Sequence, residues 1–217
     1  MTHLAAPYPE REATLRRTVL RLALTLVIFM VATTTYGPVA VAQQATKMRW
    51  DIITLTSFTP PTLKEGGVAF ASATDGSFMK LTGSGTLGIR RADPVTGRGE
   101  WETFDVGNKS TGKGAYTVTG LVSFTAAPGT LPPQAIDTIS DKADARSGLA
   151  VMRIAYTKED GSPVGTGILV LSCHQPVGAP DAIFEGVIAS QGYGMDFHHA
   201  LTMHGVDANH PVFHVAR

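Results

Sequence analysis

Apolar and polar residues alternate in short runs along most of the chain from Lys47 onward, and Gly, Pro, Asp and Asn residues separate these runs. Alternation with a period of two is typical of strands that bury one face. The runs are rich in β-branched and aromatic residues, and turn signals recur roughly every 8–15 residues. We therefore expect strands at residues 48–56, 68–73, 78–89, 100–104, 115–125, 149–157, 167–174, 182–190 and 212–215.

This pattern predicts an all-β fold, namely a single antiparallel β-barrel of about eight to nine strands. A β-sandwich is the alternative, because short antiparallel strands with frequent turns suit both architectures. One short helical segment is expected near residues 133–147, where good helix formers follow Pro132-Pro133 and precede Gly148.

The first 42 residues have the layout of a secretory signal peptide. A region with four arginines precedes an uncharged apolar run of 11 residues, Leu22–Ala32, and small residues at Ala40 and Ala42 supply a cleavage site. A retained membrane anchor is the alternative, but a spanning helix needs about 20 apolar residues. We expect cleavage after Ala42, a single β domain at residues 43–217, and no membrane span in the mature chain.

The segment that begins at Arg16-Arg17 also resembles a twin-arginine export signal, although Leu15 stands where Ser or Thr is usual. Sec export is therefore favoured over Tat export, and both lead to a secreted or extracytoplasmic location in a bacterium. Cys173 is the single cysteine, so no internal disulfide is possible in an oxidising compartment.

Residues 83–88 (GSGTLG) match G-x-G-x-x-G, the spacing of glycine loops that bind phosphate groups. A dinucleotide-binding loop requires a helix directly after it, whose N-terminus faces the pyrophosphate. The segment after Gly88 contains Asp93-Pro94 and does not begin a long helix, and the other motifs of protein kinases are missing from the sequence. We therefore expect neither a nucleotide nor any other cofactor.

The glycines recur as pairs whose members are two residues apart, and such positions share one face of a strand. Strand glycines mark bends or close approaches to the backbone. Trp101 and Tyr116 are the aromatic residues that we expect to lie on the bare backbone, while a ligand cavity lined by glycine is the alternative. The pairs are Gly83/Gly85, Gly97/Gly99, Gly112/Gly114 and Gly165/Gly167.

Three segments carry a resemblance to a family: Arg49-Trp50-Asp51, Trp101-Glu102-Thr103 and Tyr116-Thr117-Val118-Thr119-Gly120. Together with the glycine pairs they extend over most of the mature chain. They resemble an uncharacterised family of exported bacterial β proteins with no assigned activity. The Gly- and Thr-rich style of the strands is also similar to dirigent and allene-oxide-cyclase barrels. No catalytic residue follows from either likeness, because no motif matches residue for residue.

Two residues are candidates for catalysis. Glu185 lies in an otherwise apolar stretch, 182–188, where a buried carboxyl group has a raised pKa and can serve as a general acid or base. An outward-facing, solvated Glu185 is the favoured alternative, since Glu is seldom buried unpaired. His174 follows Cys173 at the end of an apolar strand. We interpret Cys173 as a small core residue and not as a catalytic thiol, because adjacent strand residues point apart.

Five of the seven histidines lie within 17 residues near the C-terminus. Imidazole is the commonest ligand of transition metals in proteins, so these histidines are candidate metal ligands. Their spacing matches no defined motif, and we expect His210 and His214 to share a face only in a helix, which Pro211 disfavours. The candidates are His198, His199, His204, His210 and His214.

The 18 basic and 18 acidic residues balance. A nucleic-acid-binding protein would show a basic stripe, so nucleic acid is not expected as a partner. The sequence favours a secreted or cell-surface β protein that binds a small apolar ligand or a partner. A cyclase- or hydrolase-type enzyme with a pocket carboxylate or histidine, and a structural envelope protein, are the alternatives. The oligomeric state stays open.

Overall fold

The computed structural model describes residues 47–89, 93–190, 196–199 and 209–216, all of which belong to one compact unit, 45–217. The predicted signal peptide and its cleavage site lie outside the described residues. Within the described ranges, no helix is long and apolar enough to cross a membrane.

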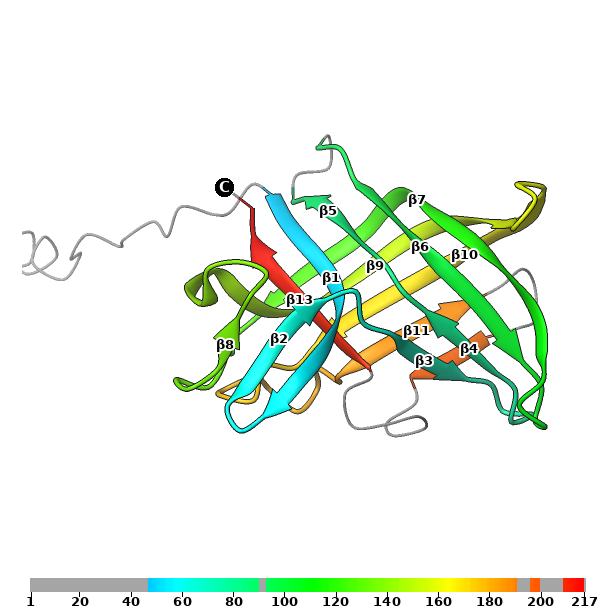
Figure 1. Cartoon of the computed structure of the whole chain (residues 1–217). Coiled ribbons are helices and arrows are strands. Elements are labelled where there is room, and N and C mark those ends of the chain that lie inside the picture. The colour runs from blue at the N-terminus through cyan, green and yellow to red at the C-terminus, as the bar shows by residue number, and fades with distance from the viewer. Residues whose placement is uncertain (1–46, 90–92, 191–195, 200–208, 217) are drawn as a thin grey trace, which may run out of the picture. The chain divides into compact units, whose positions relative to one another are not determined.

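The described residues form thirteen strands and one turn of 3₁₀ helix, Lys142–Asp144, which confirms the all-β fold class (Figure 1). The strands are β1 (Lys47–Phe58), β2 (Pro61–Glu65), β3 (Ala69–Ser72), β4 (Phe78–Leu81), β5 (Ser84–Gly88), β6 (Thr96–Phe104), β7 (Ser110–Ala127), β8 (Ile136–Asp137), β9 (Ala145–Lys158), β10 (Pro163–Cys173), β11 (Gly186–Ser190), β12 (Asp196–His199) and β13 (His210–Val215).

The strand pairing closes on itself. Hydrogen-bonded neighbours run β9–β10–β11–β12–β3–β4–β6–β7 and return to β9, all of them antiparallel. Strands β13, β1 and β5 form a second path from β9 to β6, and β2 extends from β1. This ring of strands is compatible with the predicted barrel and with its sandwich alternative.

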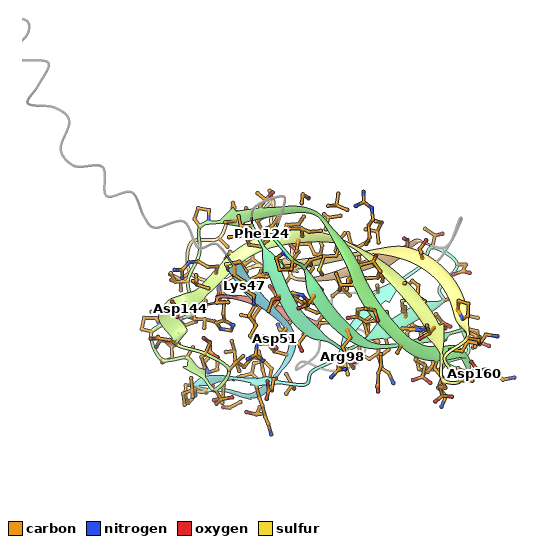
Figure 2. All side chains as sticks on the ribbon, turned by 90° about the horizontal axis from the view of Figure 1, so that it is seen from above. Lys47, Asp51, Arg98, Phe124, Asp144 and Asp160 are labelled. Atoms are coloured by element: carbon orange, nitrogen blue, oxygen red, sulfur yellow. The ribbon has the colours of Figure 1, made fainter. Side chains whose placement is uncertain are left out.

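Strand β9 runs the length of the sheet. Asp144, which precedes β9, and Asp160, which follows it, lie at opposite ends in Figure 2. Along one edge β9 pairs with β7, and along the other it pairs first with β13 and then with β10. The end of β10 at Cys173 is therefore next to β13, and this junction positions the site described below.

Alternation along the strands separates a core face from an outer face. In β1, Trp50 is fully buried in the core, whereas its neighbours Arg49 and Asp51 share the other face. There the guanidinium of Arg49 donates two hydrogen bonds of 2.7 Å to the Asp51 carboxylate. Large, fully buried side chains from strands along the ring form the core, and Tyr116 and Tyr156 are two of them.

Most of the paired glycines lie on strands and permit close approach, as the sequence predicts, whereas Gly83 lies between β4 and β5 and nothing among the described residues approaches Gly165. Gly85 lies in β5, opposite Gly97 of β6, and a Cβ on Gly85 would overlap the backbone of Thr96. A Cβ on Gly97 would overlap the ring of Trp50. Because β5 pairs with strands on both of its edges, the G-x-G-x-x-G stretch belongs to a sheet and does not form a phosphate-binding loop.

The aromatic residues that pack on these glycines also bridge strands through hydrogen bonds. The predicted Tyr116 packs on Gly83, and its hydroxyl donates to the Thr82 carbonyl at 2.6 Å. The predicted Trp101 packs on Gly112, and its Nε1 donates to two main-chain carbonyls at 3.0 and 3.1 Å. Because these glycines lack a side chain, aromatic rings pack on their backbone and join neighbouring strands inside the core.

Several strand boundaries differ from the expected ones. The expected strand 78–89 is two strands, because Gly83 interrupts it and β4 and β5 pair with different parts of β6. Residues 61–65 form β2, since proline is tolerated at the first position of a strand. The expected helical segment near 133–147 contains only the 3₁₀ turn, because Ile136 and Asp137 pair with β2 instead.

Candidate functional site

An apolar pocket of about 240 Å³ lies where the β1–β2 hairpin, the end of β10 and the start of β13 meet. Ile53, Leu63, Cys173 and Val212 line it, and each is at most 3% exposed. These four side chains form the floor of the pocket. Phe58 also lines the pocket, yet its side chain is half exposed, so an apolar surface continues to solvent at this edge.

Glu185 and His210 form the polar end of this pocket. Glu185 lies just before β11, not inside a strand as expected, and its Oε2 accepts a hydrogen bond from the backbone N–H of His174. His210 begins β13, and its Nδ1 lies 3.5 Å from Oε1 of Glu185. Both side chains are 27% exposed, so solvent reaches the polar end, whereas the floor residues are almost fully buried.

The carboxyl group of Glu185 does not behave as a solvated surface group. Burial raises its pKa, and hydrogen bonds from His210 and from the backbone of His174 offset part of this effect. The favoured expectation of an outward-facing, solvated Glu185 is therefore wrong. It failed because the backbone of His174 and the ring of His210 on β13 hold the carboxyl group at the pocket.

His174 joins the same pocket and has a defined proton position. Its Nδ1 lies 2.7 Å from the carbonyl oxygen of Ile183, and a carbonyl only accepts, so Nδ1 carries a proton. The ring is thereby held by the segment that precedes Glu185. The backbone of His174 binds the carboxylate while its side chain binds the same segment, and these two contacts fix the position of Glu185.

Cys173 lines the pocket floor but lacks the features of a nucleophile. Burial, and secondarily the charge of Glu185, raise the pKa of its thiol. Its sulfur accepts a hydrogen bond from the side-chain amide of Gln175, with an Nε2–Sγ distance of 3.2 Å. Because the thiolate is the reactive form, Cys173 has the character of the inert core cysteine that the sequence suggests.

The candidate metal ligands do not come together among the described side chains. His210 and His214 both lie on β13, four residues apart, and therefore on one face, because strand side chains repeat every two residues. The expectation that only a helix would align them is wrong. His210 contacts Glu185, whereas Nε2 of His214 lies 2.7 Å from Oδ2 of Asp137.

Among the described residues, no group of three or more His, Cys, Asp or Glu side chains is arranged to hold a metal ion. The backbone of His198 and His199 pairs with β3, but their side chains lie outside the described part of the structure. His204 lies outside the described residues altogether. A metal site that involves these three residues stays a prediction.

The Asp137–His214 pair is buried, since both side chains are at most 1% exposed. Burial disfavours the ionised form of Asp137, but hydrogen bonds from His214 and from two backbone N–H groups outweigh it, and the pKa of Asp137 is lowered. Within the described part of the chain, Nδ1 of His214 has no hydrogen-bond partner. The pair ties β8 to β13, and so holds the chain segment near Leu131 against the pocket.

The structure thus brings three of the sequence candidates, Glu185, His174 and His210, to one pocket. Sequence reasoning missed Asp137 and the hairpin that supplies Leu63. The alternation of His210, Val212 and His214 is the one signal that could have indicated a shared face, and the sequence reasoning did not use it. No signal in the sequence indicated that β13 meets Glu185, because that contact depends on strand order.

No family model, curated protein or solved structure matches this chain. The resemblance to exported bacterial β proteins therefore stays a prediction from the sequence.

Proposed function

We propose that this protein is an exported β protein that binds a small apolar molecule in the pocket between the β1–β2 hairpin, β10 and β13. The observation that carries the proposal is a buried apolar floor beside a partly solvated polar end. Ligand sites have this composition, with apolar walls and a few convergent polar groups. The half-exposed Phe58 extends the apolar surface to the opening, where a ligand would enter.

The size of the pocket limits the ligand. A cavity of roughly 150 Å³ accommodates benzene, so about 240 Å³ is sufficient for one ring with a short substituent. The core of the ring of strands is filled by large buried side chains such as Trp50 and Tyr156. We therefore assign binding to the peripheral pocket and not to the interior of the ring.

Calorimetric titration of the protein with benzyl alcohol tests this assignment. Leu55 lines the pocket from a partly buried position, so Leu55→Trp is expected to fill the space and abolish binding. Val122→Trp is the matched control, because Val122 is a half-exposed apolar residue of β7. Binding that both variants retain would place the ligand elsewhere. An absence of binding by the unmodified protein would favour a structural envelope role.

Acid–base catalysis in the same pocket is the second candidate function. The contact between His210 and a carboxyl group with a raised pKa favours it, since such a pair can exchange protons with a bound substrate. A hydrolase of this kind is expected to cleave a small aryl ester such as phenyl acetate. The rate should fall at least about a hundredfold in Glu185→Gln. An equal rate in the two proteins would exclude this role for Glu185.

Export is proposed from the sequence of residues 1–42 alone. The balanced charge and the single cysteine of the chain are compatible with it.

A further inference from the structure

We propose that the pocket selects small apolar amines, whose ammonium group binds Glu185 while their apolar body lies on the floor. This inference rests on the proposed function and adds the class of ligand. It follows from the arrangement of the polar end, which presents an acceptor to the ligand.

The exposure of the lining residues limits the shape of the ligand. The floor residues Ile53, Leu63 and Val212 are almost fully buried, whereas Glu185 and His210 are each 27% exposed. A molecule that fills the pocket therefore has one apolar end in a buried environment and one end that stays in contact with water. That arrangement fits an amphiphile, because its polar group keeps part of its hydration and loses little free energy on binding.

The contacts of Glu185 indicate the polar group of the ligand. A carboxylate accepts about four hydrogen bonds on its two oxygens. Oε2 of Glu185 accepts one from the backbone of His174, and Oε1 has a contact of 3.5 Å with His210, at the outer limit of a hydrogen bond. With respect to the described residues, Glu185 thus has acceptor capacity beyond these contacts. A ligand group that donates hydrogen bonds satisfies this capacity, whereas a ligand carboxylate would meet like charge.

The charge of Glu185 favours a ligand ammonium group over a ligand hydroxyl group. Both groups donate hydrogen bonds, but only the ammonium compensates the charge of the carboxylate. Burial raises the pKa of Glu185, because the ionised carboxylate is less well stabilised in the pocket than in water. A cation bound at this position stabilises the ionised carboxylate. Charge-assisted hydrogen bonds correspond to about a tenfold gain in affinity or more over a ligand without the group.

Four ligands of nearly equal size separate the possibilities: benzylamine, benzyl alcohol, benzoate and toluene. Titration calorimetry at pH 8, above the ordinary pKa of imidazole, gives their affinities. We expect benzylamine to bind at least about tenfold more tightly than toluene, benzyl alcohol to lie between them, and benzoate to bind most weakly. Benzoate binding that equals or exceeds benzylamine binding would overturn the inference.

A neutral replacement of the carboxylate provides the second readout. Glu185→Gln keeps the acceptor for the His174 N–H, and we expect it to lose the preference for benzylamine while its toluene affinity stays within about twofold. Glu159→Gln is the control, because Glu159 is an exposed carboxylate that pairs with Lys113 on another part of the sheet. A benzylamine preference that survives Glu185→Gln would refute the role of Glu185.

The two proposals fail in different ways. If toluene binds but the four ligands follow another order, the amine inference fails and the pocket assignment stands. If none of the four binds, both proposals fail.

Discussion

Adding one methyl group at Gly85 tests the reason for the glycine pairs. A Cβ at this position would lie 2.5 Å from the Cα of Gly97 and would overlap the backbone of Thr96, which precedes Gly97 in β6. These neighbours are backbone atoms of β6, which pairs with β5 and cannot move without breaking the sheet. Gly85→Ala is therefore expected to separate β5 from β6.

The matched control is Gly120→Ala. Gly120 also lies in a strand, β7, but the nearest atom to its added Cβ is the guanidinium Nη1 of Arg153 at 3.7 Å, an ordinary contact. Overpacking costs typically about 1–3 kcal/mol. A Gly→Ala change also stabilises the folded state by about 0.4–1 kcal/mol, because it reduces the conformational entropy of the unfolded chain. This contribution is common to both variants, so their free energies of unfolding should differ by the overpacking cost alone, about 1–3 kcal/mol.

Thermal and urea unfolding, followed by the fluorescence of the buried Trp50 and Trp101, measures this difference. For a domain of this size 1 kcal/mol corresponds to a shift of about 2–4 °C, so the midpoint of Gly85→Ala should lie about 2–12 °C below that of Gly120→Ala. Titration with ATP and NAD should show no binding. A Gly85→Ala protein with the same midpoint as Gly120→Ala, or nucleotide binding that the Gly85 substitution abolishes, would refute the close-approach explanation.

Three further predictions concern titration and processing. The raised pKa of Glu185 makes stability fall as pH rises through the interval between its ordinary and its folded pKa, so Glu185→Gln should raise the melting midpoint at pH 8 but not at pH 4. The lowered pKa of Asp137 contributes stability that is lost as pH falls through its folded value. Asp137→Asn should therefore lower the free energy of unfolding in urea by about 3–5 kcal/mol at pH 7 and by much less in acid. An equal loss of unfolding free energy at both pH values would contradict this. N-terminal sequencing of the exported protein should begin at Gln43, and a membrane-bound product that retains residues 22–32 would contradict cleavage.

The fold class could be predicted from sequence because its signals are local. The alternation in β1 places Trp50 on one face and Asp51 on the other whatever the neighbours are. The glycine pairs likewise indicate close approach, and Tyr116 and Trp101 were identifiable as the aromatic partners. The partner of Gly97, which is Trp50, was not identifiable, because the contact depends on β5 lying between β1 and β6.

The site was predictable only in its parts. An isolated Glu185 in an apolar stretch left a buried and a solvated carboxyl group open, and the solvated one was favoured. The outcome depends on contacts with the His174 backbone and with His210 of β13, which are far from Glu185 in the strand pattern of the sequence. The meeting of His210 with Glu185, and of His214 with Asp137, is set by the pairing of β13 with β1 and β9. Such long-range pairings leave no mark on local composition.

A crystal structure with 4-bromobenzyl alcohol tests directly whether the peripheral pocket binds a small apolar molecule. We expect an anomalous bromine peak beside Ile53, Leu63 and Val212, with the hydroxyl group toward Glu185. A bromine peak at another place, or an empty pocket at a concentration that saturates the protein in solution, would contradict this expectation.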